Sequence, residues 1–400
     1  MNSTARSDVI CFGGEDWWYH NRAHVDIQLM RRFARRGRVL YVNSIVMRKP
    51  NVAEGRMFLR RLRRKLGSLR RGLVEAEPGL FVYSPVTLPV HHLPGAGSLN
   101  QVALRGQMAR ALRKLRMQEP LVWVACPAAC ETALRLPRAG LVYQRTDRYE
   151  EYPGVDGEVI SGFDRRLKAE ADVTFFVNRL LFDQERADCR NAYLLDHGVD
   201  YDLFASAEEE PAVPEEMQGL GHPVVGFFGG IDDHTSDIAL VTEAARRATD
   251  MTFVFVGSVS ADVSGLRALP NVQLLGQRPY EQVPHYGKCF DVAIMPWRQN
   301  RWIQACNPIK LKEYLALGKP VVSTPFPELA QYDGLIYQAT DPTSFLAAIR
   351  QALAEDTEER RAARRERVKS HTWDAKAEEA LGVIERAVAR DASSTRNASG

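Results

Sequence analysis

The sequence predicts an α/β protein with two doubly wound domains, and three observations support this prediction. Short apolar runs alternate with amphipathic segments along most of the 400 residues. The runs are rich in Val, Leu, Ile, Phe and Tyr and lack strict polar alternation, which is typical of strands buried on both faces of a parallel sheet. An acidic stretch with two prolines, residues 205–222, divides the runs into two series. Strand–helix alternation of this kind favours parallel sheets with right-handed crossovers.

The expected strands lie on both sides of this acidic stretch. The first series comprises residues 8–14, 38–44, 80–85, 121–127, 141–147 and 173–178. The second comprises residues 223–230, 251–258, 271–276, 291–297, 320–326 and 334–340. Helical patterns between the strands include residues 21–36, 98–116, 235–248 and 307–317. We therefore expect domains at residues 1–200 and 223–372, a linker at 201–222, a C-terminal helix at 373–390 and a disordered tail at 391–400.

Composition and charge exclude several classes of protein. Apolar residues make up 45% and charged residues 26%, which disfavours a largely disordered, collagen-like or coiled-coil chain. The net charge of +3 is too balanced to indicate a nucleic-acid binder by itself. The six cysteines are scattered, which disfavours a zinc site or a disulfide framework and fits a reducing compartment. A signal peptide is not expected, because the N-terminus has no apolar h-region before a cleavage site. A transmembrane segment is not expected either, because the longest apolar stretch is about half of the ~20 residues that a span needs.

A glycine pair follows the first expected strand of each domain, at Gly13-Gly14 and Gly229-Gly230. Glycine at this position lets the backbone approach a ligand and exposes N–H groups at the start of the next helix. Neither pair belongs to a G-x-G-x-x-G motif, so the fingerprint of a nicotinamide dinucleotide site is missing. Each pair is therefore either a ligand contact or a tight strand–helix turn.

The most informative segment is NPIKLKEYLALGKPVVST at residues 307–324. It predicts a helix that starts near Pro308, with Asn307 as its N-cap, and ends at the glycine of LGKP. Free N–H groups at this start would attract an anion, and Lys310 would add a positive charge one turn in. Glu313 could accept hydrogen bonds from a sugar or ribose hydroxyl. The alternative is a solvated Lys–Glu pair, which would contribute only a few tenths of a kcal/mol.

This segment resembles the donor-site signature of GT-B nucleotide-sugar glycosyltransferases. The resemblance is strongest with the family-4-like group and with bacterial enzymes that build exopolysaccharide or teichuronic acid. Four further segments resemble the same family in the same order: LLDHGVDYDLF, VVGFFGGIDDHTSDIAL, NVQLLGQRPYEQVP and DVAIMPW. Together they cover most of residues 190–355. The first 190 residues match in outline only, as is usual for the half of such enzymes that binds the acceptor.

The resemblance implies a GT-B fold, in which two facing Rossmann-like domains bind the acceptor and the nucleotide sugar. The N-terminal domain would bind the acceptor and the C-terminal domain the donor. Lys310 and the backbone at the start of its helix would hold the donor diphosphate, while Glu313 would bind the ribose. The second glycine pair would approach the phosphates. The implied donor-binding residues are Gly229, Gly230, Asn307, Pro308, Ile309, Lys310 and Glu313.

One position departs from the family pattern. Retaining members often carry two glutamates with seven residues between them; Glu313 matches the second, but Ala305 stands at the first position. That glutamate contacts the transferred sugar in those enzymes, so the sugar and the stereochemical outcome stay open. The same loss disfavours a same-fold alternative, a sugar-nucleotide 2-epimerase, because its chemistry would need several carboxylates around the sugar.

In the N-terminal half, the expected strand at residues 141–147 ends in Asp147. Ligands lie at the carboxyl ends of strands in open α/β sheets. Asp147 resembles the aspartate that some inverting GT-B enzymes use as general base, a role that requires it to reach the acceptor hydroxyl. The alternative is an aspartate that caps a loop or pairs with Arg145 or Arg148.

An aromatic loop, EDWWYHNRAH at residues 15–24, follows the first glycine pair. Trp17 and Trp18 could stack on a sugar or touch lipid, with Gly14 beside them on the acceptor side. His20 is a second candidate for the catalytic base. The alternatives are a helix cap and an aromatic contact with the core.

A basic segment, RMFLRRLRRKLGSLRR at residues 56–71, contains eight Arg and Lys residues and no acidic residue. Its leucines recur at alternating spacings of three and four, which gives an apolar stripe between basic flanks. Such a stripe is typical of a helix that lies on anionic lipid. The residues expected to contact the membrane are Arg60, Arg61, Arg63 and Arg64. The alternatives are a nucleic-acid patch and a solvated helix packed on the core.

The sequence therefore predicts a glycosyltransferase of polysaccharide biosynthesis, which moves a sugar from a nucleoside-diphosphate sugar to a glycan or lipid-linked acceptor. We expect no cofactor beyond this co-substrate, no metal and no nucleic-acid partner. The triplet Asp200-Tyr201-Asp202 lies between the domains and is assigned no metal, since side chains and helix N-termini can stabilise the leaving diphosphate. We expect a cytoplasmic protein, peripheral on the inner membrane face if the basic segment binds lipid. The alternative from another class is a catalytically silent, membrane-associated binding protein.

Overall fold

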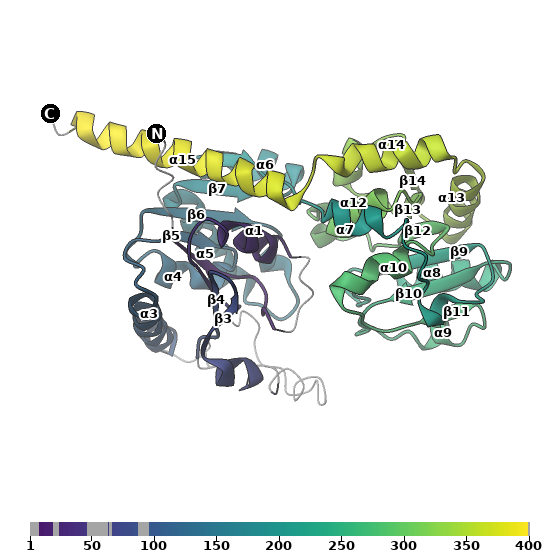
Figure 1. Cartoon of the computed structure of the whole chain (residues 1–400), viewed down its shortest axis with the longest axis horizontal. Helices are drawn as coiled ribbons and strands as arrows, with labels where there is room; N and C mark the ends of the chain where they lie inside the picture. Colours follow the sequence, from purple (N-terminus) through teal and green to yellow (C-terminus); the bar gives the residue numbers. More distant parts are fainter. Residues whose placement is uncertain (1–7, 19–23, 46–62, 64–65, 87–95, 399–400) are drawn as a thin grey trace. The chain divides into compact units, whose positions relative to one another are not determined.

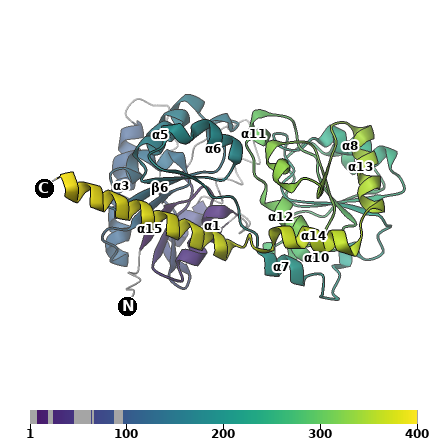
Figure 2. The same ribbon diagram turned by 90° about the horizontal axis from the view of Figure 1, so that it is seen from above.

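The chain divides into two compact units (Figure 1). The computed structural model describes residues 8–18, 24–45, 63, 66–86 and 96–398. Unit 1 comprises Met1–Asp196 and Lys376–Gly400, and unit 2 comprises His197–Ala375. Each unit has a largely parallel sheet with helices on both faces (Figure 2), which confirms the predicted α/β architecture with two doubly wound sheets.

Unit 1 is built on an eight-stranded sheet in the order β3-β4-β2-β1-β5-β6-β7-β8. Its strands are β1 (Val9–Phe12), β2 (Val39–Val42), β3 (Leu73–Glu77), β4 (Leu80–Tyr83), β5 (Leu121–Val124), β6 (Gly140–Arg145), β7 (Val173–Phe176) and β8 (Ala192–Leu194). Neighbouring strands are parallel except β3 and β4. The chain leaves β1 in one direction for β2 and later returns on its other side as β5. The carboxyl ends of β1 and β5 therefore flank a topological switch point.

Helices cover both faces of this sheet. They are α1 (Val25–Phe33), α3 (Ala96–Leu115), α4 (Cys130–Ala133), α5 (Gly157–Glu170), α6 (Arg179–Glu185) and α15 (Trp373–Ala398). Helices α5 and α6 lie on one face, and α1 and α15 lie on the other (Figure 2). Strands β1, β2, β5 and β7 are buried at every position, as expected of a doubly covered sheet. Trp123 of β5 and Phe175 of β7 stack in this core, with ring centroids 5.6 Å apart.

Unit 2 is built on a six-stranded parallel sheet in the order β11-β10-β9-β12-β13-β14. Its strands are β9 (Val224–Phe228), β10 (Thr252–Val256), β11 (Val272–Leu274), β12 (Val292–Met295), β13 (Val321–Ser323) and β14 (Ile336–Gln338). This is the strand order of the Rossmann fold, and its switch point lies between β9 and β12. Loops that follow these two strands are therefore the first place to look for a ligand site.

The helices of unit 2 start and end at residues with clear local signals. They are α7 (Tyr201–Ser206), α8 (Ile238–Arg247), α9 (Ser264–Arg267), α10 (Val283–Gly287), α11 (Arg301–Gln304), α12 (Ile309–Ala316), α13 (Pro342–Ala354) and α14 (Glu358–Lys369). Asp237 caps α8 and Asp341 forms a capping box with Ser344 at α13. Gly318, with φ of 73°, ends α12 as predicted. Helices α8 and α13 cover one face, and α10, α12 and α14 cover the other (Figure 2).

Two strands of unit 1 were not expected. Strand β3 contains two glutamates in LVEAE, is only partly buried and pairs antiparallel with β4. Strand β8 has three residues, all partly buried. Both lie at edges of the sheet, where tertiary pairing rather than a continuous apolar run defines the strand.

The segment at residues 201–222, expected to be a linker, belongs to unit 2. Its first residues form α7, and Phe204 of this helix is fully buried. The Phe204 ring packs near Phe228 and Tyr280, at centroid distances of 6.1 and 5.9 Å. The Phe204 side chain thus anchors this stretch to unit 2, although the overall composition of the stretch is acidic.

The C-terminal helix is longer than expected. Helix α15 spans Trp373–Ala398 and includes most of the segment predicted to be a disordered tail. No glycine or proline occurs between residues 383 and 398, so no residue with a strong local preference ends the helix before Ser399.

Within the described residues, none of the helices combines the length and apolar composition that crossing a membrane requires. The same residues contain no group of three or more His, Cys, Asp or Glu side chains placed to hold a metal ion.

Candidate functional site

The start of helix α12 lies at the carboxyl end of β9, next to the switch point of unit 2. The Phe228 N–H, at the end of β9, donates a hydrogen bond to the Tyr314 hydroxyl of α12, with an N–O distance of 2.8 Å. The two rings are also in contact, with centroids 4.2 Å apart. Because Tyr314 is fully buried, this pairing fixes α12 against the strand. The sequence LKEYLALG thus brings the residues of its first turn to the edge where open α/β sheets bind ligands.

Gly229 and Lys310 meet at this edge, although they are far apart in the sequence. Gly229 has φ of 134°, and a Cβ atom on it would lie 2.3 Å from the Lys310 Nζ. Only glycine therefore fits here without moving the lysine. The Lys310 Nζ also lies 4.4 Å from the centroid of the Phe227 ring and 5.5 Å from that of Trp297, distances at which a cation is attracted to an aromatic face.

Burial lowers the pKa of Lys310 to about 8, although the negative charges of Glu313 and Asp232 and the Cys306 thiol act in the opposite direction. No carboxylate within the described residues lies close enough to form an ion pair with this lysine. A partly desolvated cation without a paired anion favours an incoming negative charge. The site therefore suits an anionic ligand.

Glu313 lies one turn after Lys310 and is buried, with 4% of its surface exposed. Its Oε1 accepts a hydrogen bond from the Tyr280 hydroxyl, at 2.9 Å. Burial raises the pKa of Glu313 to about 7, although the Tyr280 hydrogen bond and the Lys310 charge oppose this rise. Asp200 adds a small further rise. A carboxylate of this kind can accept a hydrogen bond from a hydroxyl group near neutral pH.

Helix α12 begins one residue later than predicted. Pro308, with φ of −76° and ψ of 121°, occupies the cap position, and the helix runs from Ile309. Asn307 is buried and precedes the cap position. Gly230 is exposed beside this region. The N–H groups of Ile309 and Lys310 have no acceptor within the described residues, which is normal for the first turn of a helix.

At the corresponding glycine turn of unit 1, a side chain of the protein itself accepts the hydrogen bond of the glycine N–H. The Gly14 N–H donates to Asp26 Oδ2 at 2.8 Å, and the Tyr41 hydroxyl donates to the same oxygen at 2.8 Å. Trp17 is buried and makes an edge contact with Tyr41, with centroids 5.4 Å apart. The position of Trp17 favours the alternative of an aromatic contact with the core. Trp18 is partly exposed and lies beneath the Arg71 guanidinium, 4.4 Å from it; His20 lies outside the described residues.

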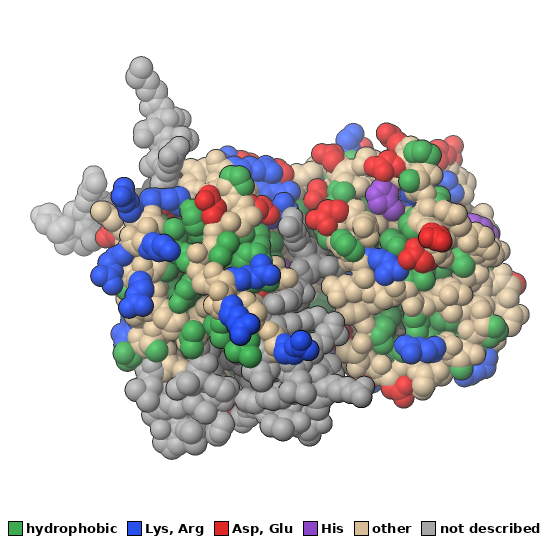
Figure 3. Space-filling model, turned by 60° about the horizontal axis from the view of Figure 1, so that its bottom comes forward, with side chains coloured by type: hydrophobic (Ala, Val, Ile, Leu, Met, Phe, Trp, Pro, Cys, Tyr) green, Lys and Arg blue, Asp and Glu red, His purple; other side chains and the backbone are tan. Residues whose placement is uncertain are grey.

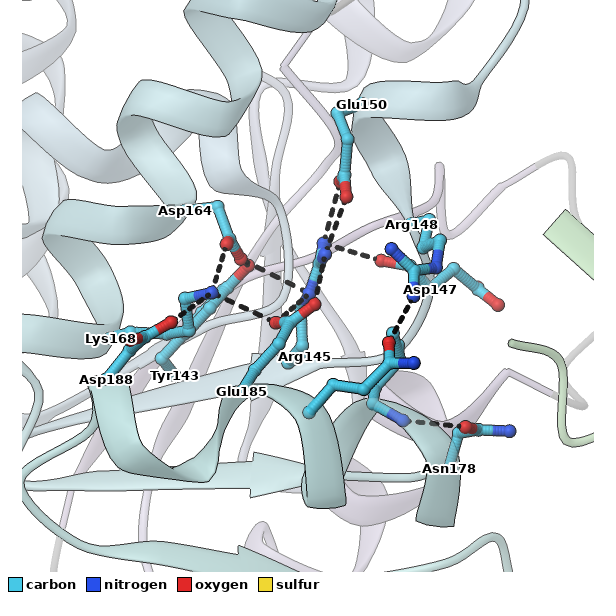
Figure 4. A network of polar contacts seen from close by, with 12 residues as sticks. Tyr143, Arg145, Asp147, Arg148, Glu150, Asp164, Lys168, Asn178, Glu185 and Asp188 are labelled. Atoms are coloured by element: carbon cyan, nitrogen blue, oxygen red, sulfur yellow. Dashed lines mark hydrogen bonds and ion pairs between the residues drawn. The ribbon is translucent and has the colours of Figure 1, made fainter. Parts of the chain in front are cut away.

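Asp147 lies two residues after the end of β6 and is partly exposed. Its carbonyl oxygen accepts a hydrogen bond from Arg145 Nη1 at 2.8 Å, whereas its carboxylate points away from Arg145 (Figure 4). Arg148 donates to Gln184 at 2.6 Å. The turn that carries Asp147 also reaches the glycine turn of unit 1, because a Cβ on Gly14 would lie 3.5 Å from the Tyr149 hydroxyl. Asp147 therefore stands at the carboxyl edge of the sheet, as predicted.

A cluster of charged side chains lies behind Asp147, and we call it the Arg145 cluster. It consists of Tyr143, Arg145, Glu150, Asp164, Lys168 and Glu185 (Figure 4). The Arg145 side chain is 1% exposed and lies 2.8 Å from Glu150, 3.2 Å from Glu185 and 3.3 Å from Asp164. Lys168 pairs with Asp164 at 2.8 Å. Burial alone would raise the pKa values of Glu150 and Glu185, but their hydrogen bonds and charge interactions with Arg145 lower them below the ordinary range.

Sequence reasoning missed this cluster, because its members come from β6, α5, α6 and the turn after β6. Two signals were present. Arg145 is the last residue of a strand that is buried at every position, where an unpaired charge would be strongly unfavourable. Asp164 and Lys168 are four residues apart on α5, the spacing of a helical ion pair.

The basic segment is described only in part: Arg60, Arg61 and Arg64 lie outside the described residues. Arg63 is exposed, and residues 66–71 are helical. Leu66 is 51% exposed, whereas Ser68 is buried and its hydroxyl donates to Asp16 at 2.9 Å. The end of the segment thus contacts unit 1 through Ser68, and one leucine of the predicted stripe faces outward.

Comparison with known proteins identifies the domain that holds Lys310. Residues 222–355 match the family of glycosyl transferases group 1. This part of the chain is therefore similar to a glycosyltransferase group 1 domain. The putative teichuronic acid biosynthesis glycosyltransferase TuaH of Bacillus subtilis (strain 168) is 36% identical over 175 residues, which are 42% of this chain and 44% of that protein. The chain therefore aligns with less than half of the length of that relative.

Solved structures extend the likeness to the whole chain at the level of fold. Sucrose-phosphate synthase from Thermosynechococcus elongatus aligns over 96% of this chain and 100% of its own, with a TM-score of 0.71 and 15% identity. HepE of Anabaena, solved in complex with UDP and glucose, aligns over 95% of this chain and 99% of its own, with a TM-score of 0.65 and 14% identity. These similarities confirm the predicted GT-B fold. The segment that matches the glycosyltransferase group 1 family contains Gly229, Lys310 and Glu313, whereas Asp147 lies outside it.

Proposed function

We propose that this protein moves a sugar from a nucleoside-diphosphate sugar to a hydroxyl group of a glycan or lipid-linked acceptor. The observation that carries the proposal is the position of Lys310 against Gly229, at the switch point of a glycosyltransferase group 1 domain. A diphosphate group would supply the anion that this cation lacks. Charge-assisted contacts of this kind are among the stronger polar interactions in proteins.

The donor would be held mainly by four features of unit 2. Lys310 would contact the diphosphate, and the N–H groups at the start of α12 would add hydrogen bonds to it. The Gly229-Gly230 turn would let the backbone approach the same phosphates. Glu313, whose second oxygen has no hydrogen bond within the described residues, would accept from the ribose hydroxyls.

The chemistry follows from charges that develop during transfer. The acceptor oxygen forms a bond to the anomeric carbon of the sugar as the bond to the diphosphate oxygen breaks. Asp147 would take the acceptor proton, while Lys310 would stabilise the charge of the leaving diphosphate. Direct displacement inverts the anomeric configuration. This scheme uses no metal ion and no cofactor beyond the co-substrate.

Ala305 supports the inverting scheme. Its side chain is fully buried and offers no carboxylate to the sugar, unlike the glutamate found at this position in retaining relatives. A glycan or lipid-linked acceptor is supported by the TuaH relative, which is described as a teichuronic acid biosynthesis glycosyltransferase. We therefore propose that the reaction takes part in the synthesis of cell-surface polysaccharide.

Incubation of the purified protein with a panel of nucleoside-diphosphate sugars tests the proposal. We expect release of nucleoside diphosphate that depends on an added hydroxyl acceptor. Conversion of the donor to an epimer without acceptor would instead identify the 2-epimerase alternative. A thermal shift with nucleotide but no turnover with any acceptor would support the catalytically silent alternative, since bound ligand stabilises the fold regardless of chemistry.

We also propose that unit 1 binds the anionic face of a membrane, which would place the protein on the cytoplasmic side. The residues of unit 1, 1–196 and 376–400, contain 36 Lys and Arg against 25 Asp and Glu, whereas those of unit 2, 197–375, contain 17 against 25. Figure 3 shows Lys and Arg side chains beside apolar ones on unit 1, and more acidic side chains on unit 2. The outward position of Leu66 and the exposure of Arg63 and Arg70 fit contact with lipid.

Flotation with phosphatidylglycerol vesicles tests this surface. We expect binding at low salt that fades as salt rises, since each basic residue near anionic lipid contributes about 1 kcal/mol. A variant with Arg60, Arg61, Arg63 and Arg64 changed to Gln should not float. The matched control R246Q/R247Q, which removes exposed arginines of unit 2, should float normally. Absence of flotation of the unaltered protein, or preferential binding to nucleic acid with a steep salt dependence, would contradict the membrane proposal.

A further inference from the structure

The turn between β6 and α5 carries the proposed general base, and one side chain holds this turn at two points. Arg145, the last residue of β6, donates through Nη1 to the Asp147 carbonyl oxygen at 2.8 Å. The same guanidinium forms two hydrogen bonds with the Glu150 carboxylate, at 2.8 and 3.0 Å. Two residues, Arg148 and Tyr149, lie between these two contacts along the chain. The turn is therefore tied to a single planar group at the Asp147 carbonyl and at the Glu150 side chain.

The guanidinium is in turn held from the opposite side. Glu185 of α6 accepts from Arg145 Nε and Nη2 at 3.2 Å, and Asp164 of α5 lies 3.3 Å from Nε. Lys168 pairs with both of these carboxylates, which fixes them as well. In Figure 4 the cluster lies on one side of the turn, and the Asp147 carboxylate points to the other side. The arginine therefore cannot shift without breaking several buried ion pairs at once.

We propose that Arg145 is a positioning residue for sugar transfer, which acts by clamping the Asp147 carbonyl and the Glu150 carboxylate so that the Asp147 carboxylate is directed toward the acceptor. This inference rests on the proposed role of Asp147 as general base. Arg145 itself touches no reacting atom. Its effect is on the orientation of the base, where a displacement of about 1 Å can lower a rate by about a hundredfold.

Direct replacement of Arg145 is a poor test, because it would leave three carboxylates in a buried site with too little positive charge. Replacement of Glu150 loosens the clamp and leaves the other ion pairs of the cluster in place. After E150A, Arg145 still pairs with Glu185 and Asp164, so the fold should persist. Glu131→Ala is the matched control: it also removes the carboxylate partner of an arginine, Arg166, from a side chain of similar exposure, 21% against 19%, but Glu131 belongs neither to the Arg145 cluster nor to the turn.

The measurements are kcat, KM for the donor and the denaturation midpoint of each variant. We expect E150A to lower kcat about 10–100-fold with little change in the donor KM, and E150Q, which keeps one acceptor oxygen, to recover part of the loss. E131A should keep kcat within about threefold of the unaltered protein. Equal kcat losses in E150A and E131A, or a kcat loss in E150A that only follows its denaturation midpoint, would show a merely structural role and overturn the proposal.

A double-mutant cycle separates this inference from the function on which it rests. If Glu150 and Arg145 act through Asp147, E150A should lower kcat no further in a D147N background. Additive losses would contradict positioning of Asp147. Full activity of D147N alone would instead reject Asp147 as the base, whereas an inactive D147N with an unimpaired E150A would reject only the clamp.

Discussion

The two units carry equivalent glycine turns, but the charged group beside the turn is a carboxylate in unit 1 and an ammonium in unit 2. In each, a glycine pair follows the first strand and lies at the switch point of a doubly wound sheet. In unit 1 the Gly14 N–H is bonded to the buried Asp26 carboxylate, which also accepts from Tyr41. In unit 2 the corresponding turn lies against the Lys310 ammonium, which has no ion-pair partner within the described residues.

This difference shows how one fold separates two tasks. A carboxylate already supplies the anion at the unit 1 turn, so a second anion there would be repelled. At the unit 2 turn, the Lys310 ammonium would instead attract an anionic ligand. In unit 1, the buried charges of the Arg145 cluster pair with one another, behind the outward carboxylate of Asp147. Unit 2 would thus bind the anionic donor, and unit 1 would supply the base.

The largest expected effect is on the base of unit 1. Asp147→Asn keeps the shape of the side chain and removes its basicity, so kcat should fall about 10²–10⁴-fold with donor affinity nearly unchanged. Asp183→Asn, which neutralises an exposed aspartate of α6, is the matched control and should leave kcat unaltered. Rate assays with saturating donor measure both. Near-normal turnover of D147N, or a product of retained configuration by NMR, would move the base elsewhere.

The glycine pair of unit 2 permits a test of turn geometry. Gly229→Ala would place a Cβ at φ of 134° and 2.3 Å from Lys310 Nζ, so the free energy of unfolding should fall by about 1–3 kcal/mol. Gly230→Ala meets its nearest atom, Ser258 Oγ, only at 3.8 Å and should change that free energy by about 0.5 kcal/mol or less. Urea denaturation compares the two. Equal stabilities of the two variants would show that the Gly229 contact with Lys310 is not formed in solution.

The pH dependence of donor binding should be a narrow maximum between about pH 7 and 8. Binding of a diphosphate favours charged Lys310, whose pKa is about 8, so affinity is lost as the pH rises through that value. A ribose hydroxyl favours ionised Glu313, whose pKa is about 7, so affinity is also lost as the pH falls through that value. Calorimetric titration with UDP from pH 6 to pH 9 measures the profile.

Two substitutions separate the limbs of this profile. Lys310→Arg stays charged at every pH of the series and should remove the alkaline decline. Glu313→Gln should remove the acidic decline. A profile of the unaltered protein that is flat across the whole series would contradict the assignment of both groups to the donor site.

Local sequence signals were sufficient to predict much of the fold and the local structure around Lys310 and Glu313. Apolar runs without alternation identified the central strands, because strands covered on both faces need apolar residues at every position. The segment containing Lys310 and Glu313 predicted its helix to within one residue, because its proline and its terminal glycine restrict the backbone locally. The family resemblance on those residues is confirmed.

Features made by distant residues could not be read in the same way. The Arg145 cluster joins three elements that no local pattern connects, and Trp17 proved to be buried because Tyr41 lies beside it. The contact of Lys310 with Gly229 likewise depends on the hydrogen bond that joins Tyr314 to the end of β9. Such contacts depend on the order of the strands in the sheet. The sequence predicts that strands and helices alternate, but it does not predict this order.

The most direct test of the account is the affinity of the protein for UDP when one lysine at either end of α12 is removed. Lys310→Ala deletes the cation at the start of the helix, and Lys319→Ala deletes one just beyond its end, where the side chain pairs with Glu208 at 2.7 Å. Isothermal titration calorimetry should show affinity about 10–100-fold weaker for K310A, the loss expected of one charge-assisted contact, and unchanged for K319A. Equal affinities of K310A and the unaltered protein, with both correctly folded, would contradict the claim that the unit 2 turn is the donor site.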